Sequence, residues 1–201
     1  MRSNPASAEA SDDPLKLFAR WFREAKRAGT PLPEAMALAT TDAGGQPSVR
    51  MVLLRGVGPR GFVFYTNYES RKARELAENP RAAFAFHWPF IQKQVRGEGR
   101  VVRVSRQESS RYFASRPRES RLSAWASPQS TEILDRRFLE EELARVRARF
   151  SGKDIPCPPF WGGFRIILES IEFWHERPHR LHDRVLFHRR GRDWTRRRLA
   201  P

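Results

Sequence analysis

The amino-acid sequence predicts a mainly β fold with helices (α+β), in which an antiparallel barrel carries helices packed on its outside. Short segments rich in β-branched and aromatic residues dominate the 201-residue chain. Turn sequences such as DAGGQ at 42–46 join the early segments as hairpins, which is typical of antiparallel sheets. Helical segments are inserted between strands, and the sequence has no repeats. A chain of this length suits one core, so we expect a single domain over 13–201.

The N-terminal part predicts a disordered segment followed by a helix. Residues 1–12 are polar and rich in Ser and Ala, so we expect disorder there. Asp13 before Pro14 is typical of a helix start, with the Asp side chain as N-cap. The apolar residues that follow share one helical face: Leu17, Phe18, Trp21, Phe22 and Ala25. Gly29 is expected to end this helix.

The remaining elements alternate between strands and helices. We expect strands over residues 35–41, 47–54, 62–66, 82–88, 94–104, 164–174, 184–188 and 194–199. Further helices are expected from Ser70, as N-cap, to about 79, over 106–115, and over 131–150. Pro117 should end the second of these helices, and prolines at 156, 158 and 159 should form a stiff link.

The composition narrows the class of protein. No window approaches the roughly 18 to 20 apolar residues of a membrane span. The first twelve residues hold no apolar signal-peptide core, and the single Cys157 suits a reducing compartment. We therefore expect a cytoplasmic protein with no membrane partner.

The net charge is +15, carried by 33 Arg and only 5 Lys. Nucleic-acid binding is one interpretation, and an Arg-favouring genome is the plainer one because the basic residues spread along the chain. A small phosphorylated ligand would also favour Arg, whose guanidinium binds phosphate oxygens in pairs. We treat nucleic acid as a minor alternative.

The segment RLHDR at 180–184 suggests a ligand-binding face. In an extended strand Arg180, His182 and Arg184 would share one face. Two permanent charges around a group that titrates near neutral pH suit an anionic, planar ligand.

Two segments further up the chain could hold an anion. In RMVLLR at 50–55, Arg50 and Arg55 should point to opposite faces or opposite ends of a strand, although an ordinary strand with charged ends gives the same pattern. In YTNYESRK at 65–72, Arg71 and Lys72 oppose the helix dipole at a helix start. They make sense beside a bound phosphate, and a solvated basic helix start is the alternative.

A third candidate lies in YFASRPRES at 112–120. Tyr112 and Arg116 are four apart on a predicted helix, and Ser120 follows a turn at Pro117. A phenol, a guanidinium and a hydroxyl together would suit phosphate, while a charged helix end is the alternative.

Together these motifs resemble the pyridoxamine 5'-phosphate oxidase family of flavin enzymes. The resemblance runs from Asp13 to Pro201 and includes RMVLLR, FYTN at 64–67, SRKA at 70–73, SRPR at 115–118, FWGGFR at 160–165 and RLHDR. It implies the FMN-binding split β-barrel fold with helices outside. It also implies a homodimer with its sites at the interface, so the site residues need not all come from one chain.

The resemblance implies particular roles for residues. Those implied to hold FMN are Arg50, Met51, Val52, Leu53, Leu54, Arg55, Tyr65, Thr66, Arg71, Lys72, Gln94, Gln129, Ser130, Trp174 and Arg184. Those implied to hold the substrate are Arg55, Tyr112, Arg116, Ser120, Arg180, Leu181 and His182. Arg180 and His182 are the implied catalytic residues, and no metal is expected. Position 55 is often Lys in the family and is Arg here, which alters the donor geometry.

The implied reaction is FMN-dependent oxidation of pyridoxamine 5'-phosphate and pyridoxine 5'-phosphate by dioxygen. The products are pyridoxal 5'-phosphate and hydrogen peroxide, as in vitamin B6 biosynthesis and salvage. Whether His182 moves a proton or only positions the substrate stays open. The alternatives are a related split-barrel oxidase acting on a phenazine precursor, or a basic protein that binds pyridoxal phosphate or nucleic acid.

Overall fold

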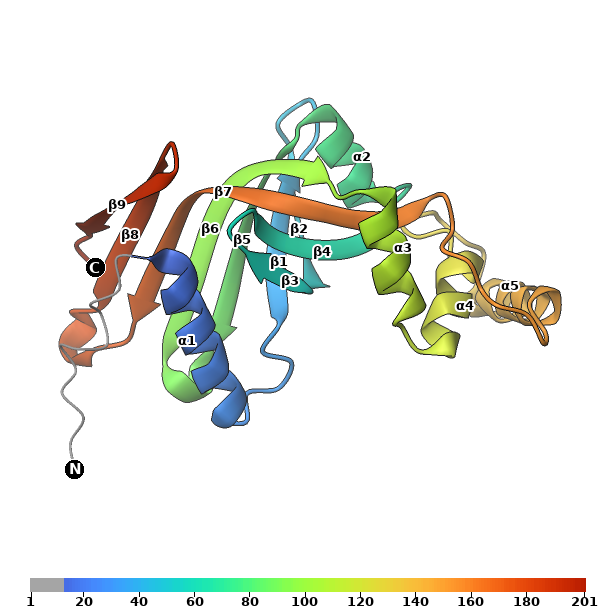
Figure 1. Ribbon diagram of the computed structural model, residues 1–201, viewed down its shortest axis with the longest axis horizontal. Helices are drawn as coiled ribbons and strands as arrows, with labels where there is room; N and C mark the ends of the chain where they lie inside the picture. The colour runs from blue at the N-terminus through green and yellow to red at the C-terminus, as the bar shows by residue number, and fades with distance from the viewer. Residues whose placement is uncertain (1–12) are drawn as a thin grey trace.

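The computed structural model describes residues 13–201 and shows a curled antiparallel sheet flanked by helices (Figure 1). The strands are β1 (Ala35–Thr41), β2 (Pro47–Leu53), β3 (Gly56–Gly58), β4 (Gly61–Asn67), β5 (Arg81–Trp88), β6 (Lys93–Arg103), β7 (Trp161–His175), β8 (Asp183–Arg190) and β9 (Asp193–Arg198). The helices are α1 (Pro14–Arg27), α2 (Arg71–Glu78), α3 (Arg106–Ala114), α4 (Arg118–Ala126) and α5 (Arg136–Arg149), with 3-10 turns η2 (Pro89–Ile91) and η3 (Pro178–Arg180). The expected disorder of 1–12 lies outside the described residues.

Strand β7 organises the sheet. The strands follow the order β2-β1-β5-β6-β7-β4-β3, and β8 and β9 branch from β7. The first part of β7 pairs with β4, its last part pairs with β8, and β6 runs along the opposite edge. The sheet therefore divides along one edge of a single long strand, and Figure 1 shows β7 crossing most of the molecule.

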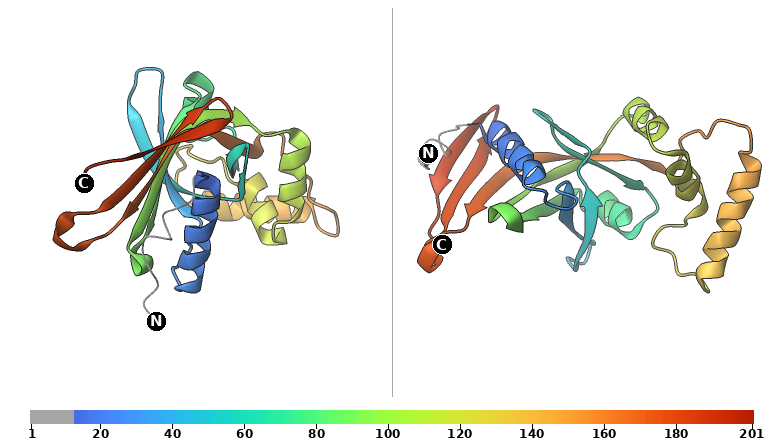
Figure 2. Two further views of the ribbon diagram at one scale, coloured as in Figure 1. Left: turned by 60° about the vertical axis from the view of Figure 1, so that its left-hand side comes forward. Right: turned by 90° about the horizontal axis from the view of Figure 1, so that it is seen from below.

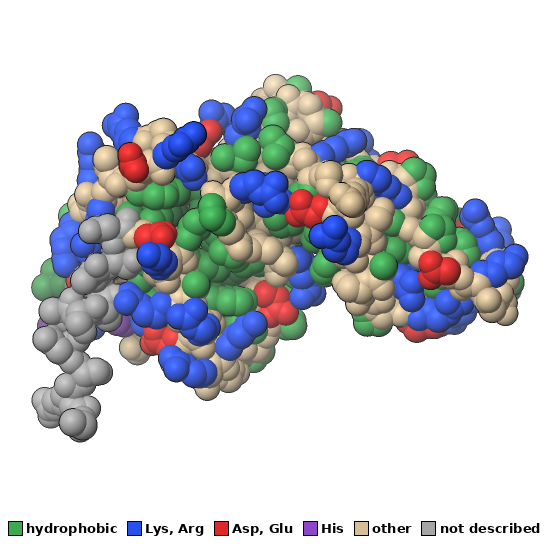
Figure 3. All heavy atoms as spheres, viewed as in Figure 1, with side chains coloured by type: hydrophobic (Ala, Val, Ile, Leu, Met, Phe, Trp, Pro, Cys, Tyr) green, Lys and Arg blue, Asp and Glu red, His purple; other side chains and the backbone are tan. Residues whose placement is uncertain are grey.

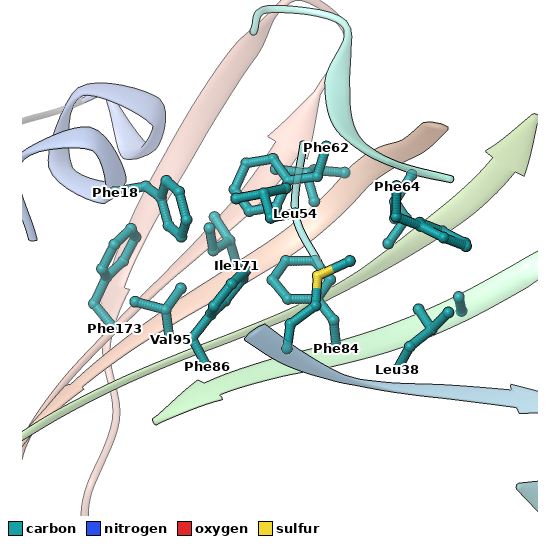
Figure 4. Packing of buried hydrophobic residues seen from close by; sticks show 14 of the residues in the cluster. Phe18, Leu38, Leu54, Phe62, Phe64, Phe84, Phe86, Val95, Ile171 and Phe173 are labelled. Atoms are coloured by element: carbon teal, nitrogen blue, oxygen red, sulfur yellow. The ribbon is translucent and has the colours of Figure 1, made fainter. Parts of the chain in front are cut away.

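A cluster of aromatic side chains fills the inside of the curled sheet (Figure 4). Strand β5 alternates buried and exposed residues, so Phe84 and Phe86 point inward. Helix α1 covers this core with Phe18, whose ring centroid lies 4.6 Å from that of Phe62. The Asp13 carboxylate caps α1 by accepting from the backbone N–H groups of residues 15 and 16.

Helices α3, α4 and α5 form an arm at one end of the sheet, opposite the β8–β9 hairpin (Figures 1 and 2). The arm has a small core of its own, which includes Phe113, Leu122, Phe150 and Trp161. Trp161 is the first residue of β7, so its backbone belongs to the sheet while its side chain packs in the core of the arm.

The mainly β fold with external helices is confirmed, and each expected strand is present with ends that differ by up to three residues. Three details of the prediction were wrong. A short strand, β3, lies between the strands expected at 47–54 and 62–66, where no strand was predicted. Pro117 ends α3 but also sits at the N-cap of α4, a helix that the sequence did not predict. Helix α5 starts at Arg136, because the Asp135 carboxylate caps it, and not at residue 131.

Candidate functional site

A cavity of about 600 Å³ lies between strands β2 and β4 and helices α3 and α4. Its walls combine cations, hydroxyls and aromatic rings. The lining residues predicted from the sequence are Arg50, Met51, Val52, Leu53, Arg55, Tyr65, Thr66, Lys72, Tyr112, Arg116, Gln129 and Ser130. Because β2 ends at Leu53, strand alternation does not govern Arg55, and it lines the same cavity as Arg50.

Lys72 is the buried cation of this cavity, with a residue exposure of 7%. Its ammonium group donates to the Thr66 hydroxyl, the Ser70 hydroxyl and the Gln129 side-chain oxygen, each at 3.1 Å. Burial, followed by the nearby Arg50 charge, lowers the pKa of Lys72 to about 8, and Glu75 opposes this shift. Ser70 occupies the expected N-cap position, but its hydroxyl donates to the Asn67 carbonyl and does not cap α2.

Arg116 supplies a second cationic group that is held by aromatic rings. Its guanidinium carbon lies 4.8 Å from the ring centroid of Trp161. Trp161 is stacked in turn with Tyr65 and Tyr112, whose own ring centroids are 4.0 Å apart. Burial lowers the pKa of Arg116 and raises the pKa of Tyr65 to about 12, with Glu108 adding to the second shift. Arg116 lies just beyond the end of α3, so the chain places it near Tyr112 without a shared helix.

Within the described residues, the buried Arg116 Nη1 atom has no hydrogen-bond partner. A buried donor without a partner is costly, and a bound anion would satisfy it. The donor chemistry of this cavity therefore suits a phosphorylated ligand.

A second group of predicted residues lies on β6, β7 and β8. Gln94 is paired directly with Trp174, and Trp174 with Arg184, so the three side chains form one row on one face of the sheet. The Arg184 guanidinium donates to the buried Glu172 carboxylate at 2.8 Å and to the Ala200 carbonyl at 2.8 Å. These bonds fix the direction of the Arg184 side chain.

The expectation that Arg180, His182 and Arg184 share one strand face was wrong. Strand β8 begins only at Asp183, and Arg180 lies in the turn η3 with a left-handed φ of 60°. Proline at the start of this turn interrupts the extended chain. His182 still joins the second group, because its ring centroid lies 4.6 Å from that of Trp174 and its Nδ1 accepts from the Arg177 backbone N–H.

The cavity and the second group lie far apart on one chain. Trp161 in the cavity wall and Trp174 in the row stand near opposite ends of β7. At about 3.3 Å per residue, they are roughly 40 Å apart along the strand. One chain does not bring the two groups to one small ligand.

Four predicted residues lie at the margins of these groups. Ser120 is not among the residues that line the cavity, whereas Ser123 and Ser127, further along the chain, are. Leu54 belongs to the hydrophobic core, and Leu181 is 70% exposed. The Arg71 side chain is 57% exposed and pairs with Glu75.

Sequence reasoning missed several residues of the cavity wall and its support. They are Asn67, Glu75, Ser123, Ala124, Ser127 and Trp161. Trp161 lies in the motif FWGGFR, which could have indicated it. No sequence pattern pointed to Glu75, because a carboxylate is an ordinary residue in a helix rich in charged residues.

Known protein structures define the class of fold to which the chain belongs. In fold the chain is a split-barrel protein. PhzG from Burkholderia lata, solved with tetrahydrophenazine-1-carboxylic acid, superposes with a TM-score of 0.92 at 32% identity, over 100% of this chain and 98% of that one. An FMN-binding protein from Nostoc punctiforme, described as related to pyridoxamine 5'-phosphate oxidase, superposes with a TM-score of 0.76 at 19% identity, over 94% of this chain and 98% of that one, which shows the fold alone.

The sequence comparisons are more specific. Residues 22–150 match the family model for pyridoxamine 5'-phosphate oxidase, and residues 161–201 match the C-terminal dimerisation region of pyridoxine 5'-phosphate oxidase. Relatives named pyridoxine/pyridoxamine 5'-phosphate oxidase are 52% identical in Rubrobacter xylanophilus, over 100% of this chain and 92% of the relative, and 52% identical in Cupriavidus necator, over 98% and 92%. The chain belongs to the pyridoxamine 5'-phosphate oxidase family.

None of the helices in residues 13–201 is long and apolar enough to cross a membrane. The same residues contain no group of three or more His, Cys, Asp or Glu side chains placed to hold a metal ion.

Proposed function

We propose that this protein is an FMN-dependent oxidase that converts pyridoxamine 5'-phosphate and pyridoxine 5'-phosphate to pyridoxal 5'-phosphate, with dioxygen as the oxidant and hydrogen peroxide as a product. The observation that carries the proposal is the cavity with separate cationic groups at Lys72 and Arg116. The relatives named for this activity, 52% identical along the chain, support the choice of substrate.

The chain's residues suit FMN at the Lys72 side of the cavity. Arg50 and Lys72 offer charge for the FMN phosphate from the cavity wall, and Arg71, at the start of α2, would add to it. Thr66 and Gln129 offer polar contacts for the ribityl chain. The row Gln94, Trp174 and Arg184 would contact the isoalloxazine ring. When bound, FMN would accept a hydride equivalent from the substrate and return the electrons to dioxygen.

The Arg116 side of the cavity suits the substrate phosphate. Arg55, Tyr112 and Arg116 would hold that phosphate, and its binding energy would orient the reacting carbon. Arg180 and His182 would lie over the pyridine ring, where Arg180 would order the ring and stabilise developing charge. The exposed position of Arg180 leaves it free to meet a ligand held by another chain.

We further propose that two copies of the chain complete each site. The cavity of one protomer would meet the row on β6–β8 of its partner, which resolves the separation of the two groups along β7. The match of residues 161–201 to a dimerisation region supports this arrangement, because those residues include Trp174 and Arg184.

Purification and assay with alternative substrates would test the proposed function. We expect a yellow protein that releases FMN on denaturation and forms aldehyde from pyridoxamine 5'-phosphate, consuming dioxygen. A flavin-free protein, or a flavoprotein that forms no aldehyde, would contradict the proposal.

One observation favours a second candidate. The structure superposes closely on PhzG, which was solved with a tetrahydrophenazine carboxylic acid. The same flavoprotein should therefore be assayed with that compound, and faster turnover of it would favour phenazine chemistry. Binding to nucleic acid has less support, since Lys and Arg in Figure 3 are scattered among acidic and apolar residues on the face shown.

A further inference from the structure

The proposed FMN phosphate site is supported by a buried carboxylate that the proposed function leaves without a role. Glu75 lies on α2, and its side chain is 5% exposed. It accepts from the Ser48 hydroxyl at 2.7 Å, from Arg50 at 3.1 Å, from Arg71 at 2.8 Å, and from the Thr40 hydroxyl. One carboxylate therefore links strands β1 and β2 to the start of α2.

We propose that Glu75 is a positioning residue, which holds the Arg50 and Arg71 guanidinium groups in fixed directions so that a phosphate meets a preformed site. This inference rests on the proposed assignment of FMN to this part of the cavity.

Glu75 has two opposing electrostatic effects on an anion bound beside it. A negative charge beside an anion site weakens the anion's attraction by direct repulsion. Arg50, Arg71 and Lys72 also repel one another. Arg50 is also held by the Leu38 carbonyl and by the Thr40 and Ser48 hydroxyls, whereas the exposed Arg71 side chain would turn into solvent without Glu75. Glu75 offsets that repulsion and removes the entropy cost of ordering the arginines when the ligand binds. Glu75 therefore strengthens binding only if the benefit of orienting the arginine side chains exceeds the repulsion between its carboxylate and the phosphate.

Glu75 also affects the charge on Lys72. The charged groups that face Lys72 are Arg50, from β2, and Glu75, from its own helix, while its hydrogen-bond partners are uncharged. Arg50 lowers the pKa of Lys72, whereas Glu75 raises it and so helps to keep the ammonium protonated near neutral pH. Loss of the Glu75 charge should therefore shift the deprotonation of Lys72 to lower pH.

The test is titration of the full-length apoprotein with FMN, followed by quenching of flavin fluorescence, for the wild type and Glu75→Gln. We expect Glu75→Gln to weaken FMN binding about tenfold, because the Arg71 side chain must then be ordered on binding and Arg50 has lost its charged partner. Riboflavin, which lacks the phosphate, should bind both proteins equally. Between pH 7 and 9, the decline of FMN affinity with rising pH should begin at lower pH in Glu75→Gln.

The matched control is Glu78→Gln, because Glu78 is an exposed carboxylate on the same helix that accepts from the backbone of residue 43. It should leave FMN affinity unchanged. Equal or tighter FMN binding by Glu75→Gln would overturn the inference, since removal of a negative charge alone predicts tighter binding. An equal loss of riboflavin affinity would also overturn it, because a general structural defect would explain that result.

Two further measurements separate the possible failures. Failure of the wild-type protein to bind FMN would overturn the proposed function and this inference with it, whereas tight wild-type binding with no effect of Glu75→Gln overturns the inference alone. If Glu75→Gln does not fold, Glu75→Asp keeps the charge and withdraws the carboxylate by one methylene. We then expect weaker FMN binding at an unchanged pH midpoint, and unchanged FMN binding would overturn the inference.

Discussion

At the scale of the residue, the cavity depends on cations whose environments differ. Lys72 is buried among neutral oxygens, while Arg116 lies on the ring of Trp161 with a donor left over. In the proposed function these two cations would meet two different phosphates, so substitutions at the two positions should have separable effects.

Arg116→Ala should weaken substrate binding without loss of the flavin. A charge-assisted hydrogen bond contributes about 1.5–3 kcal/mol, so the KM for pyridoxamine 5'-phosphate should rise roughly 10- to 100-fold. Steady-state kinetics and the FMN content of the purified variant would check this. Arg111→Ala, at an exposed position on α3, is the control. Loss of FMN with little change in KM would mean that the two phosphate sites are exchanged.

Lys72 should make the stability of the flavin-free protein depend on alkaline pH. Its pKa falls from 10.5 to about 8 on folding, so between these values the unfolded chain binds a proton that the folded chain does not. Stability should therefore rise with pH through this window, by about 3 kcal/mol at most, and be flat below it. FMN affinity should fall over the same window.

Urea unfolding of the apoprotein at pH values from 7.5 to 10 would measure how the free energy of unfolding changes with pH. Lys72→Met keeps the apolar volume and removes the titration, so the difference between the two proteins isolates the contribution of Lys72. If the difference in stability between the two proteins stays constant with pH, folding does not lower the pKa of Lys72.

At the scale of the element, the curl of the sheet depends on close packing of β6 against β7. The register of this pair shifts between Glu98 and Gly99. A Cβ atom added at Gly99 would lie 2.0 Å from the carbonyl oxygen of Ile167, which is backbone and has no room to move. The bulge and the glycine together let β6 follow the curve of β7.

Gly99→Ala should therefore be severely destabilising, by roughly 3 kcal/mol or more, which corresponds to a fall in Tm of roughly 6–12 °C. Gly58→Ala is the matched control, because a Cβ at Gly58 meets nothing within 4 Å. Thermal unfolding followed by circular dichroism would compare them. Similar Tm values for both variants would contradict the close approach at Gly99.

At the scale of the whole molecule, the length of β7 keeps the cavity and the Gln94–Trp174–Arg184 row apart. If each site combines the cavity of one protomer with the row of its partner, damage to the cavity in one chain and damage near the row in the other should leave one site intact. Arg116→Ala and Arg180→Ala damage different parts of the site. At a pyridoxamine 5'-phosphate concentration well below the raised KM of Arg116→Ala, each homodimer should have little activity.

Co-expression of these two variants should restore activity to about a quarter of the wild-type value, because half of the dimers are mixed and each mixed dimer has one intact site. Isolating the mixed dimers with two affinity tags and measuring their turnover would check this. Mixed dimers with only background activity would show that each site is built within one chain.

The sequence by itself determined the fold class, every strand except β3, and most residues of the cavity wall. These follow from local physics: alternation along β5, the Asp13 cap, and the spacing of apolar residues in α1 are all properties of neighbouring residues. The FWGGFR and RMVLLR motifs are local patterns too, since each lies within one strand or at its end.

Only the tertiary structure decided how the chemistry is assembled. The RLHDR segment is not one strand face, because a turn separates Arg180 from Arg184. Glu75 joins strands β1 and β2 to α2, and Trp161 orders Arg116, through contacts between residues distant in the chain. No local pattern records such contacts, because they arise only when the curled sheet brings separate elements together. The separation of the two halves along β7 arises in the same way.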